Sequence, residues 1–224
     1  MAWSPLDAME AYMHTLHLCK EFNTNDDHTR GGSGLMEPKC MEFISALAAG
    51  NRARLLLNVE CGGFSPLTLA LAVAARHGGG RLVCIRADQQ DARDIEKHTE
   101  RFDLGDVSEI ETGEPREVVK RYEDVEFAVV DRNVEGCVDA LSGIKVNPCG
   151  GVVVVSNIAL EERGEEEEEG TLYARVVKSR GGDIESVVLP ICGGLEVTKM
   201  GRFRGGRGRR HPPRRSGKTF LVYE

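Results

Sequence analysis

The sequence lacks any long hydrophobic segment. A membrane-spanning helix needs roughly 18 uninterrupted apolar residues, whereas the longest apolar candidate among the 224 residues runs only from Leu67 to Ala75. Near the N-terminus, the segment Trp3-Ser4-Pro5-Leu6-Asp7 stands where a secretory signal peptide would carry basic residues and then an apolar run. We therefore expect neither a membrane-spanning segment nor secretion.

Cysteine pairs of the Cys-x-x-Cys type are also absent. The chain has an odd number of cysteines, spread through apolar surroundings: Cys19, Cys40, Cys61, Cys84, Cys137, Cys149 and Cys192. This pattern predicts reduced thiols in a cytoplasmic or nuclear protein, and it argues against a structural zinc site.

A strong net charge is missing as well, since 29 Lys and Arg oppose 36 Asp and Glu for a formal charge of −7. The small net charge includes two tracts of opposite charge. Residues 161–169 carry seven acids and one base, and residues 202–215 carry seven arginines and no acid. Because the rest of the chain is acidic, any attraction for nucleic acid has to come from the arginine tract alone.

Both tracts are predicted to be solvated loops, and their opposite charges allow mutual attraction if they lie close together. The arginine tract, which is rich in glycine and contains Phe203, also resembles segments that bind RNA by charge and stacking. Weak RNA binding through residues 202–215 is therefore a second interpretation of this tract.

A regular alternation of apolar, β-like runs with helical stretches begins at Arg54. Such alternation is the signature of an α/β fold with a doubly wound, mostly parallel sheet. The predicted strands are 55–59, 82–85, 107–110, 125–130 and 151–155, and the predicted helices between them are 66–76, 89–101, 115–122 and 134–142.

The pattern differs on either side of this alternation. Residues 1–50 predict two helices, about 4–20 and 37–50, that pack on a core formed by residues 51–224. After the acidic tract and a helix near 171–178, two β-like runs are joined by a glycine-containing turn, and a last run follows: 184–189, 195–200 and 219–223. The joined runs predict a β-hairpin and hence an antiparallel edge.

Open α/β sheets bind ligands at the carboxyl ends of their parallel strands. After the first predicted strand the chain reads Glu60-Cys61-Gly62-Gly63-Phe64-Ser65-Pro66, so glycines allow a sharp turn into a helix whose first amides can face a ligand. The carboxylate of Glu60 can accept a cation or an amine there. The alternative is an ordinary tight turn in which Glu60 caps backbone amides.

These residues resemble the first nucleotide-binding motif of class I S-adenosylmethionine-dependent methyltransferases, in particular the small O-methyltransferases of the caffeoyl-CoA and catechol type. The resemblance covers roughly residues 38–200 and includes Phe127-Ala-Val-Val-Asp131, Gly150-Gly-Val-Val-Val-Val-Ser156-Asn157 and Leu189-Pro-Ile-Cys-Gly-Gly-Leu195. It implies a Rossmann-like methyltransferase fold with a seven-stranded sheet, and S-adenosylmethionine as the cofactor.

The whole chain is more similar still to a plant family of uncharacterised proteins, classified only as a domain of unknown function with a methyltransferase-like fold. Trp3-Ser4-Pro5 and the segment from Ala72 to Arg81 carry this second similarity. This second similarity implies no particular reaction, because none is established for that family.

The methyltransferase resemblance implies a set of site residues. Asp131 would face the reacting centre, and the adenosyl ligand would be contacted by Glu60, Gly62, Gly63, Ser65 and Asp88. In those enzymes, however, the first loop has more residues between its glycines, and the second strand ends in an acid that binds the ribose. Here that strand ends in Arg86, so either Asp88 reaches back across the turn or ribose recognition is lost.

The same enzymes hold a divalent metal on acidic residues at the ends of the fourth and fifth strands. Asp131 and Asn157 match these ligands, while Ser156 replaces the second acid. A hard cation such as Mg²⁺ needs charged oxygen ligands. We therefore expect no metal cofactor.

Other candidate residues are weaker. His14 and His17 stand one helical turn apart, but no acid or cysteine at matching spacing completes a metal site, so a surface or interface role is expected. Cys61 is the only cysteine placed where a ligand would meet it.

Two hypotheses of different class follow. The first is an S-adenosylmethionine-binding, methyltransferase-like protein that acts on an unknown small molecule. The second is a non-catalytic Rossmann-like binding or interaction protein that has lost the metal-dependent O-methyltransferase site. The retained strand-end residues favour the first, whereas the short loop and the changes on the second and fifth strands favour the second.

Overall fold

The computed structural model describes residues 3–25, 38–158, 172–177, 184–201 and 220–221. Both charged tracts, at 161–169 and 202–215, lie outside these residues. No helix in the described part of the chain is long and apolar enough to cross a membrane.

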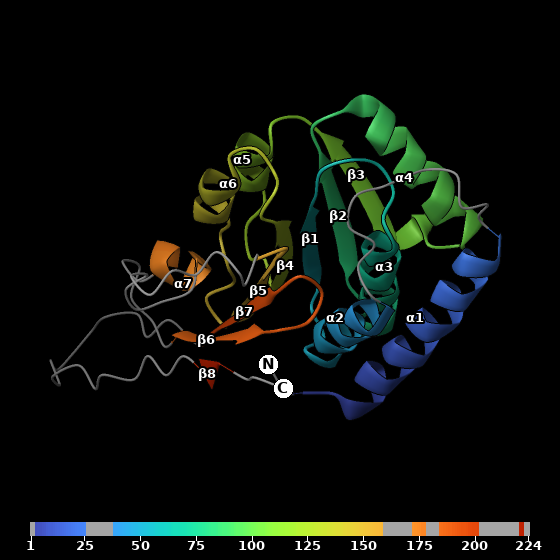
Figure 1. Ribbon diagram of the computed structural model, residues 1–224, viewed down its shortest axis with the longest axis horizontal. Helices are drawn as coiled ribbons and strands as arrows, with labels where there is room; N and C mark the ends of the chain where they lie inside the picture. The colour runs from blue at the N-terminus through green and yellow to red at the C-terminus, as the bar shows by residue number, and fades with distance from the viewer. Residues whose placement is uncertain (1–2, 26–37, 159–171, 178–183, 202–219, 222–224) are drawn as a thin grey trace, which may run out of the picture.

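A single mixed sheet forms the centre of the molecule (Figure 1). Its strands are β1 Leu55–Val59, β2 Arg81–Arg86, β3 Ser108–Thr112, β4 Phe127–Asp131, β5 Gly151–Ser156, β6 Ile184–Leu189, β7 Leu195–Met200 and β8 Phe220–Leu221. Their order is β3-β2-β1-β4-β5-β7-β6-β8. The strands from β1 to β5 pair in parallel, and β7 pairs antiparallel with both β5 and β6. The doubly wound sheet with an antiparallel hairpin is thus confirmed, and the short β8, parallel to β6, extends the expected seven strands.

The helices follow the predicted order with different limits. They are α1 Pro5–Asn25, α2 Pro38–Gly50, α3 Pro66–Gly78, α4 Gln89–Arg101, α5 Pro115–Val118, α6 Cys137–Gly143 and α7 Leu172–Val177. The helix predicted over 115–122 is wrong in its second half, where a 3₁₀ turn spans Val119–Arg121. The helix predicted from 134 starts only at Cys137, because Gly136 before it has a left-handed backbone (φ 69°).

Helices cover both faces of the sheet, so the core has two layers (Figure 1). One layer lies between the sheet and α2, α3 and α4, with Leu56, Leu82 and Phe127 contributed by the strands. The other lies between the sheet and α5, α6 and α7, with Leu57, Val83 and Val130 contributed by the strands. All six of these strand residues are fully buried. Alternate residues of each strand therefore face opposite layers.

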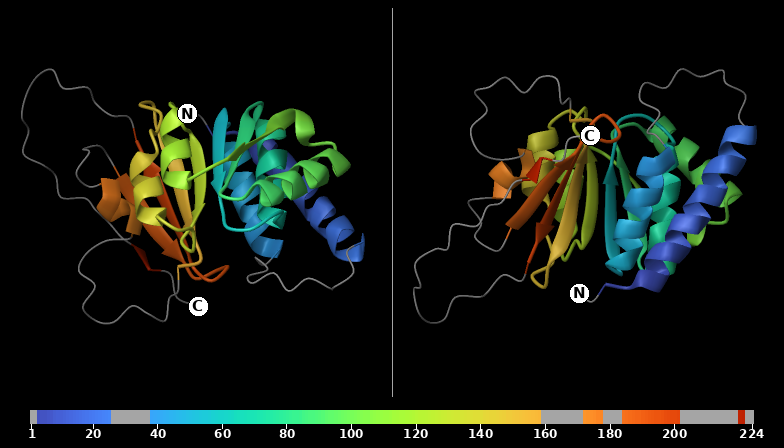
Figure 2. Two further views of the ribbon diagram at one scale, coloured as in Figure 1. Left: turned by 90° about the horizontal axis from the view of Figure 1, so that it is seen from above. Right: turned by 60° about the horizontal axis from the view of Figure 1, so that its bottom comes forward.

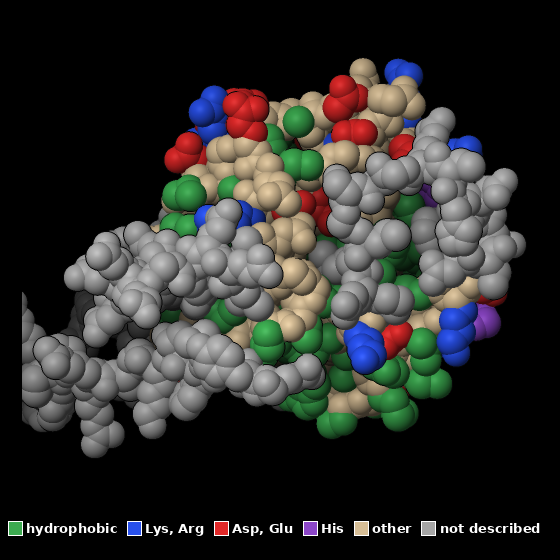
Figure 3. All heavy atoms as spheres, in the orientation of Figure 1, with side chains coloured by type: hydrophobic (Ala, Val, Ile, Leu, Met, Phe, Trp, Pro, Cys, Tyr) green, Lys and Arg blue, Asp and Glu red, His purple; other side chains and the backbone are tan. Residues whose placement is uncertain are grey.

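The first two helices pack on each other and on α3 (Figure 2). A buried hydrogen bond of 2.8 Å between the Thr15 and Ser45 hydroxyls joins α1 to α2. Trp3 covers Gly50 so closely that a Cβ atom there would lie 2.4 Å from the indole ring. Hydrophobic side chains also gather at the bottom of Figure 3, over the beginning of α1, where Leu6 and Met9 are exposed.

One disulfide corrects the prediction that all cysteines are reduced. Cys40 of α2 is bonded to Cys192 in the turn between β6 and β7, with a Cα–Cα distance of 6.0 Å. The two residues are 152 positions apart, so nothing in their spacing signals the pairing. They meet because α2 and the hairpin turn both belong to the core layer on the α3 side of the sheet. The other five cysteines are free thiols.

Candidate functional site

Several parallel strands end side by side at one edge of the sheet. In the sheet register, Val59 of β1 is level with Ile85 of β2 and Val130 of β4. The residues that follow these three positions therefore reach the same carboxyl edge, where an open α/β sheet presents its ligand site.

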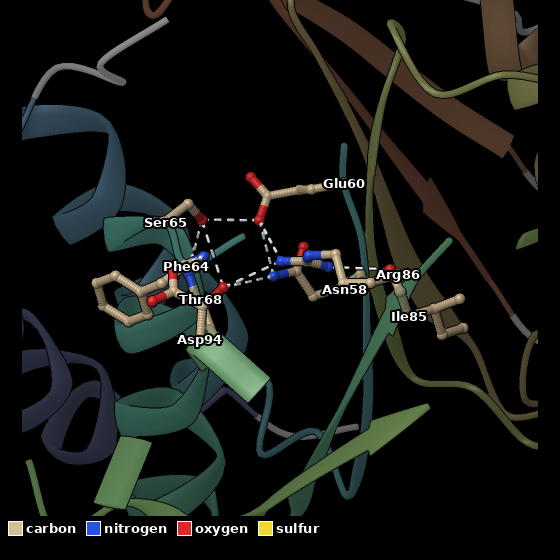
Figure 4. A network of polar contacts seen from close by, with 8 residues as sticks. All are labelled: Asn58, Glu60, Phe64, Ser65, Thr68, Ile85, Arg86 and Asp94. Carbon is tan, nitrogen blue, oxygen red and sulfur yellow. Dashed lines mark hydrogen bonds and ion pairs between the residues drawn. The ribbon is translucent and has the colours of Figure 1, made fainter. Parts of the chain in front are cut away.

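Glu60, the residue after β1, is the acceptor at the centre of a buried polar network (Figure 4). Its Oε2 atom accepts hydrogen bonds from Asn58 Nδ2 at 3.0 Å, Ser65 Oγ at 2.7 Å and Arg86 Nη2 at 2.9 Å. Its Oε1 atom contacts no donor among the described residues and points away from the network in Figure 4. The glutamate is 9% exposed, so one oxygen is fully used inside the protein while the other stays near the surface.

Arg86, at the end of β2, is the cation of this network and is completely buried. Its Nη1 donates to the backbone oxygens of Asn58 at 3.2 Å and Ile85 at 3.0 Å. Its Nη2 donates to Thr68 Oγ1 at 3.2 Å as well as to Glu60. A buried charge needs a partner of opposite sign and hydrogen bonds to its remaining donors, and Arg86 has both except at Nε, which lacks an acceptor among the described residues.

The first turn of α3 supplies the other wall. Ser65 has an extended backbone (φ −127°, ψ 151°) and caps the helix, because its Oγ accepts a hydrogen bond from Thr68 N at 3.3 Å. Pro66 occupies the first helical position, as the sequence pattern predicts. The same Ser65 hydroxyl donates to Glu60, so the helix cap and the strand-end carboxylate fix each other.

The glycine loop between β1 and α3 lies against α4. Phe64 N donates a hydrogen bond to Asp94 Oδ2 at 3.1 Å, and the Phe64 ring stacks on His98 with 4.2 Å between ring centroids. A Cβ atom on Gly63 would lie 2.7 Å from Asp94 Oδ2, so the loop approaches α4 closely. Gly62 has a left-handed backbone (φ 80°), and an added Cβ would meet nothing within 4 Å.

Asp88 begins α4 and does not join the network around Glu60. It is exposed, and its Oδ1 accepts a hydrogen bond from Gln90 N, as an N-cap residue does. One helical turn further on, Asp91 is half-buried, and loss of hydration, followed by the charge of Asp88, raises the pKa of its carboxyl group.

Asp131 and Asn157 meet at the ends of β4 and β5. Asn157 Nδ2 donates to Asp131 Oδ1 at 3.0 Å, and the same oxygen accepts from Asn133 N at 2.9 Å. Ser156 is fully buried beside them in the register, and its Oγ has no hydrogen-bond partner among the described residues. Asp131 is half-buried, and no cation in the described chain forms an ion pair with it.

Charges from both groups act on the thiol of Cys61, in the glycine loop. Loss of hydration and then the charge of Asp131 raise the pKa of its thiol, and the charges of Arg86, Glu60 and Asp91 also act on it. A raised pKa keeps the thiol protonated at neutral pH and makes it a poor nucleophile. Nothing in these surroundings activates the Cys61 thiol as a nucleophile.

The structure brings Glu60 and Ser65 into one network and leaves Asp88 outside it. Asp131 stands in the neighbouring group. Sequence reasoning did not identify Asn58 or Thr68 as members of the network. A signal existed for Asn58, because a polar residue in the otherwise apolar strand Leu55–Val59 is buried only when it has hydrogen-bond partners.

The fold and this edge define a methyltransferase-like Rossmann class of structure, and comparisons with known proteins agree. A methyltransferase from Geobacter sulfurreducens has 15% sequence identity and a TM-score of 0.57, over 85% of this chain and 88% of that one. An O-methyltransferase from Bacillus cereus, solved in complex with SAH, has 17% identity and a TM-score of 0.57, over 85% and 90% of the two chains. The O-methyltransferase TomG from Streptomyces achromogenes, solved with SAM, has 18% identity and a TM-score of 0.54, over 86% and 90%.

At these identities the likeness establishes the fold. The sequence itself matches, over residues 1–220, the family described as "Protein of unknown function (DUF1442)", and the chain belongs to that family. No curated protein matches it.

Proposed function

We propose that this protein binds an adenosyl ligand, S-adenosylmethionine or S-adenosylhomocysteine, at the carboxyl edge of β1, β2 and β4, as a methyltransferase-like protein with an unknown substrate. The observation that carries the proposal is Glu60, whose Oε1 has no donor among the described residues and points away from the polar network in Figure 4. Beside it, Gly62 leaves open space where a ligand can approach the backbone. Similar structures solved with SAH or SAM support the choice of ligand.

Each site residue has a role in this proposal. Glu60 Oε1 accepts a hydrogen bond from the ligand's ammonium group, Gly62 and Gly63 form the loop wall, and Ser65 holds Glu60 in place. S-adenosylmethionine supplies an activated methyl group on a sulfonium, so proximity and orientation would provide most of the acceleration. Asp131, half-buried at the end of β4, would then orient the methyl acceptor.

Asp88 is not positioned to bind the ribose of the ligand directly. Its carboxylate already caps α4 through Gln90 N, and the chain places Arg86 inward rather than toward the edge. In this proposal, Asp88 contacts the ribose only if its side chain rotates away from Gln90 N.

The residues at β4 and β5 do not fit a divalent cation. Among the described residues, Asp131 is the only carboxylate at the ends of these two strands. Asn157 directs its amide nitrogen toward Asp131, and this nitrogen is a hydrogen-bond donor and not a metal ligand. Ser156 is buried behind the edge. We propose that the protein works without a metal, and that Ser156→Asp is the change needed for Mg²⁺ to bind; calorimetric titration of this variant with MgCl₂ checks it.

A non-catalytic binding protein is the second candidate, and the Arg86–Glu60 ion pair favours it. An internal cation neutralises Glu60, which reduces the attraction that this carboxylate offers to a positively charged ligand. In this case the adenosyl ligand would bind without methyl transfer to any acceptor.

RNA association through residues 202–215 and a cytoplasmic or nuclear location remain predictions from the sequence. Binding of a single-stranded RNA that falls steeply with salt, and disappears when the seven arginines are changed to serine, would support the first. Binding that persists in this variant would place an RNA site elsewhere.

Isothermal titration calorimetry with S-adenosylmethionine and S-adenosylhomocysteine tests the proposed function. The wild-type protein should bind both, Gly62→Val should bind neither because its side chain fills the open space, and Glu60→Gln should weaken binding by roughly 1.5 to 3 kcal/mol. Glu123→Gln makes the same chemical change at an exposed site before β4, at the opposite edge, and should leave affinity unchanged. Absence of binding at millimolar ligand would overturn the proposal.

A further inference from the structure

The two oxygens of Glu60 are used very differently. Three donors from three different elements converge on Oε2: Asn58 from β1, Ser65 before α3, and Arg86 from β2. Oε1 takes part in none of these contacts and is directed out of the network in Figure 4. A carboxylate with free rotation would share donors between both oxygens, so the network selects one orientation of the group.

Arg86 is the member of the network that is held most firmly by the protein itself. Its guanidinium group is held by two backbone oxygens, those of Asn58 and Ile85, and by Thr68 Oγ1. Its side chain has no exposed surface. If Arg86 moved away from Glu60, two buried charges would lose their partners. We therefore expect Arg86 to stay in place when a molecule binds to this edge or leaves it.

We propose that Arg86 is a positioning residue that determines ligand specificity: by holding Oε2 inside the protein it directs Oε1 to the opening as an acceptor for a primary ammonium group. The site then prefers adenosyl compounds that carry an amino-acid chain over adenosyl compounds that lack one. This role rests on the proposed function, because it concerns the same site and the same class of ligand.

Charge balance supports a role in selection rather than in attraction. The Arg86–Glu60 pair is neutral, so it offers little long-range pull on a cation. What remains is the short-range hydrogen bond to Oε1, which only a correctly placed donor can form. Preference for an ammonium-bearing ligand therefore depends on the orientation of Glu60 and not on its charge alone.

The experiment compares two ligands by calorimetry. S-adenosylhomocysteine has the amino-acid chain, and 5′-methylthioadenosine lacks it. The wild-type protein should bind the first more tightly. Arg86→Met should lower the affinity for S-adenosylhomocysteine by about tenfold, the equivalent of one charged hydrogen bond. It should leave the affinity for 5′-methylthioadenosine within about twofold of the wild-type value. A merely structural role would weaken both ligands equally, and that result would overturn the proposal.

Two further variants keep the test sharp if Arg86→Met does not fold. Arg86→Lys retains the charge but cannot reach both backbone oxygens and Glu60 together, so it should lose part of the preference. Ser65→Ala removes another donor to Oε2 without burying an unpaired charge, and it should also lower the preference. An unchanged preference in both variants would contradict the positioning role.

The failures of the two proposals look different. A wild-type protein that binds both compounds equally would overturn the role of Arg86 and leave the proposed function standing. A wild-type protein that binds neither would overturn the proposed function and the role of Arg86 with it. Adding Glu60→Gln to Arg86→Met should cause no further loss of preference, because both changes remove the same contact.

Discussion

The two halves of the carboxyl edge use polar residues in opposite ways. At the ends of β1 and β2, a glutamate and an arginine are buried together, and four hydrogen-bond partners surround the guanidinium group. At the ends of β4 and β5, Asp131 is half-buried, its partners are an amide and a backbone N–H, and Ser156 Oγ is buried without a partner in the described chain.

In the proposed function, this difference separates positioning from reactivity. The first half is neutral and closely connected, so it fixes geometry and contributes to the stability of the fold. In the second half, the Asp131 carboxylate has only two hydrogen-bond partners among the described residues, so fewer contacts fix its side chain. We expect mutations in the first half to act mainly on stability and ligand selection, and mutations in the second half mainly on chemistry.

The largest expected effect is on stability. Arg86→Met should lower the free energy of unfolding by about 3 to 5 kcal/mol, because it leaves the Glu60 charge buried and unpaired. Asp131→Asn should cost about 1 kcal/mol or less, since the aspartate is half-buried. Urea denaturation of both variants measures the difference, and equal losses would contradict the contrast between the two halves. Replacing Glu60 and Arg86 together by methionine should recover most of the stability.

The disulfide should produce the next largest effect, because it ties α2 to the hairpin turn beside the second half. Gly193 of that turn would place a Cβ 3.6 Å from Asn157 Oδ1. Cys192→Ser should lower the free energy of unfolding by about 2 to 4 kcal/mol, whereas Cys149→Ser, at an exposed free thiol, should not. Thiol titration of the unfolded, unreduced protein should find five thiols; finding all seven cysteines reactive would remove the disulfide.

Two serines sharpen the comparison at a smaller scale. Ser65→Ala should cost about 1 kcal/mol, because it removes the helix cap and a donor to Glu60. Ser156→Ala should be neutral or slightly stabilising, because the buried hydroxyl has no partner among the described residues. Thermal unfolding of both variants checks this, and a clear loss with Ser156→Ala would show that its hydroxyl is satisfied.

The smallest effect belongs to the contact between α1 and α3, away from both halves. His14 Nδ1 lies 3.2 Å from His77 Nε2, and burial, followed by the charge of His77, lowers the pKa of His14 below 6.5. Arg76 and His17 act in the same direction, and Glu21 opposes them. Because the folded state binds this proton less readily than the unfolded state, stability should be complete above pH 6.5 and fall as the pH drops below it.

His14→Gln should remove this part of the acid sensitivity, measured as the free energy of unfolding from pH 7.5 to 5.5. His17→Gln, at an exposed position on the same helix, serves as the matched control and should reduce the acid sensitivity less than His14→Gln does, because the charge of His17 is a smaller cause of the lowered pKa of His14 than burial and His77. An identical pH profile in the His14 variant would exclude the histidine pair as its source.

Much of this fold could be predicted because local patterns encode it. The alternation of apolar strands and amphipathic helices, the Ser65-Pro66 helix start and the glycine turn all act over a few neighbouring residues. The inward direction of Arg86 could not be predicted, since it depends on Asn58 and Thr68, which lie 28 and 18 positions away. The disulfide could not be predicted either, because its two segments meet only in the folded core. The prediction of a cytoplasmic or nuclear location is based on seven reduced thiols, and two of the seven form this disulfide.

The most direct test of the proposed site is a crystal structure of the protein with S-adenosylhomocysteine. The ligand should lie over the Gly62-Gly63 loop, with its amino group within hydrogen-bond distance of Glu60 Oε1 and with Arg86 still bound to Oε2. A ligand located away from this edge, or an Arg86 side chain displaced from Glu60 by the bound ligand, would contradict it.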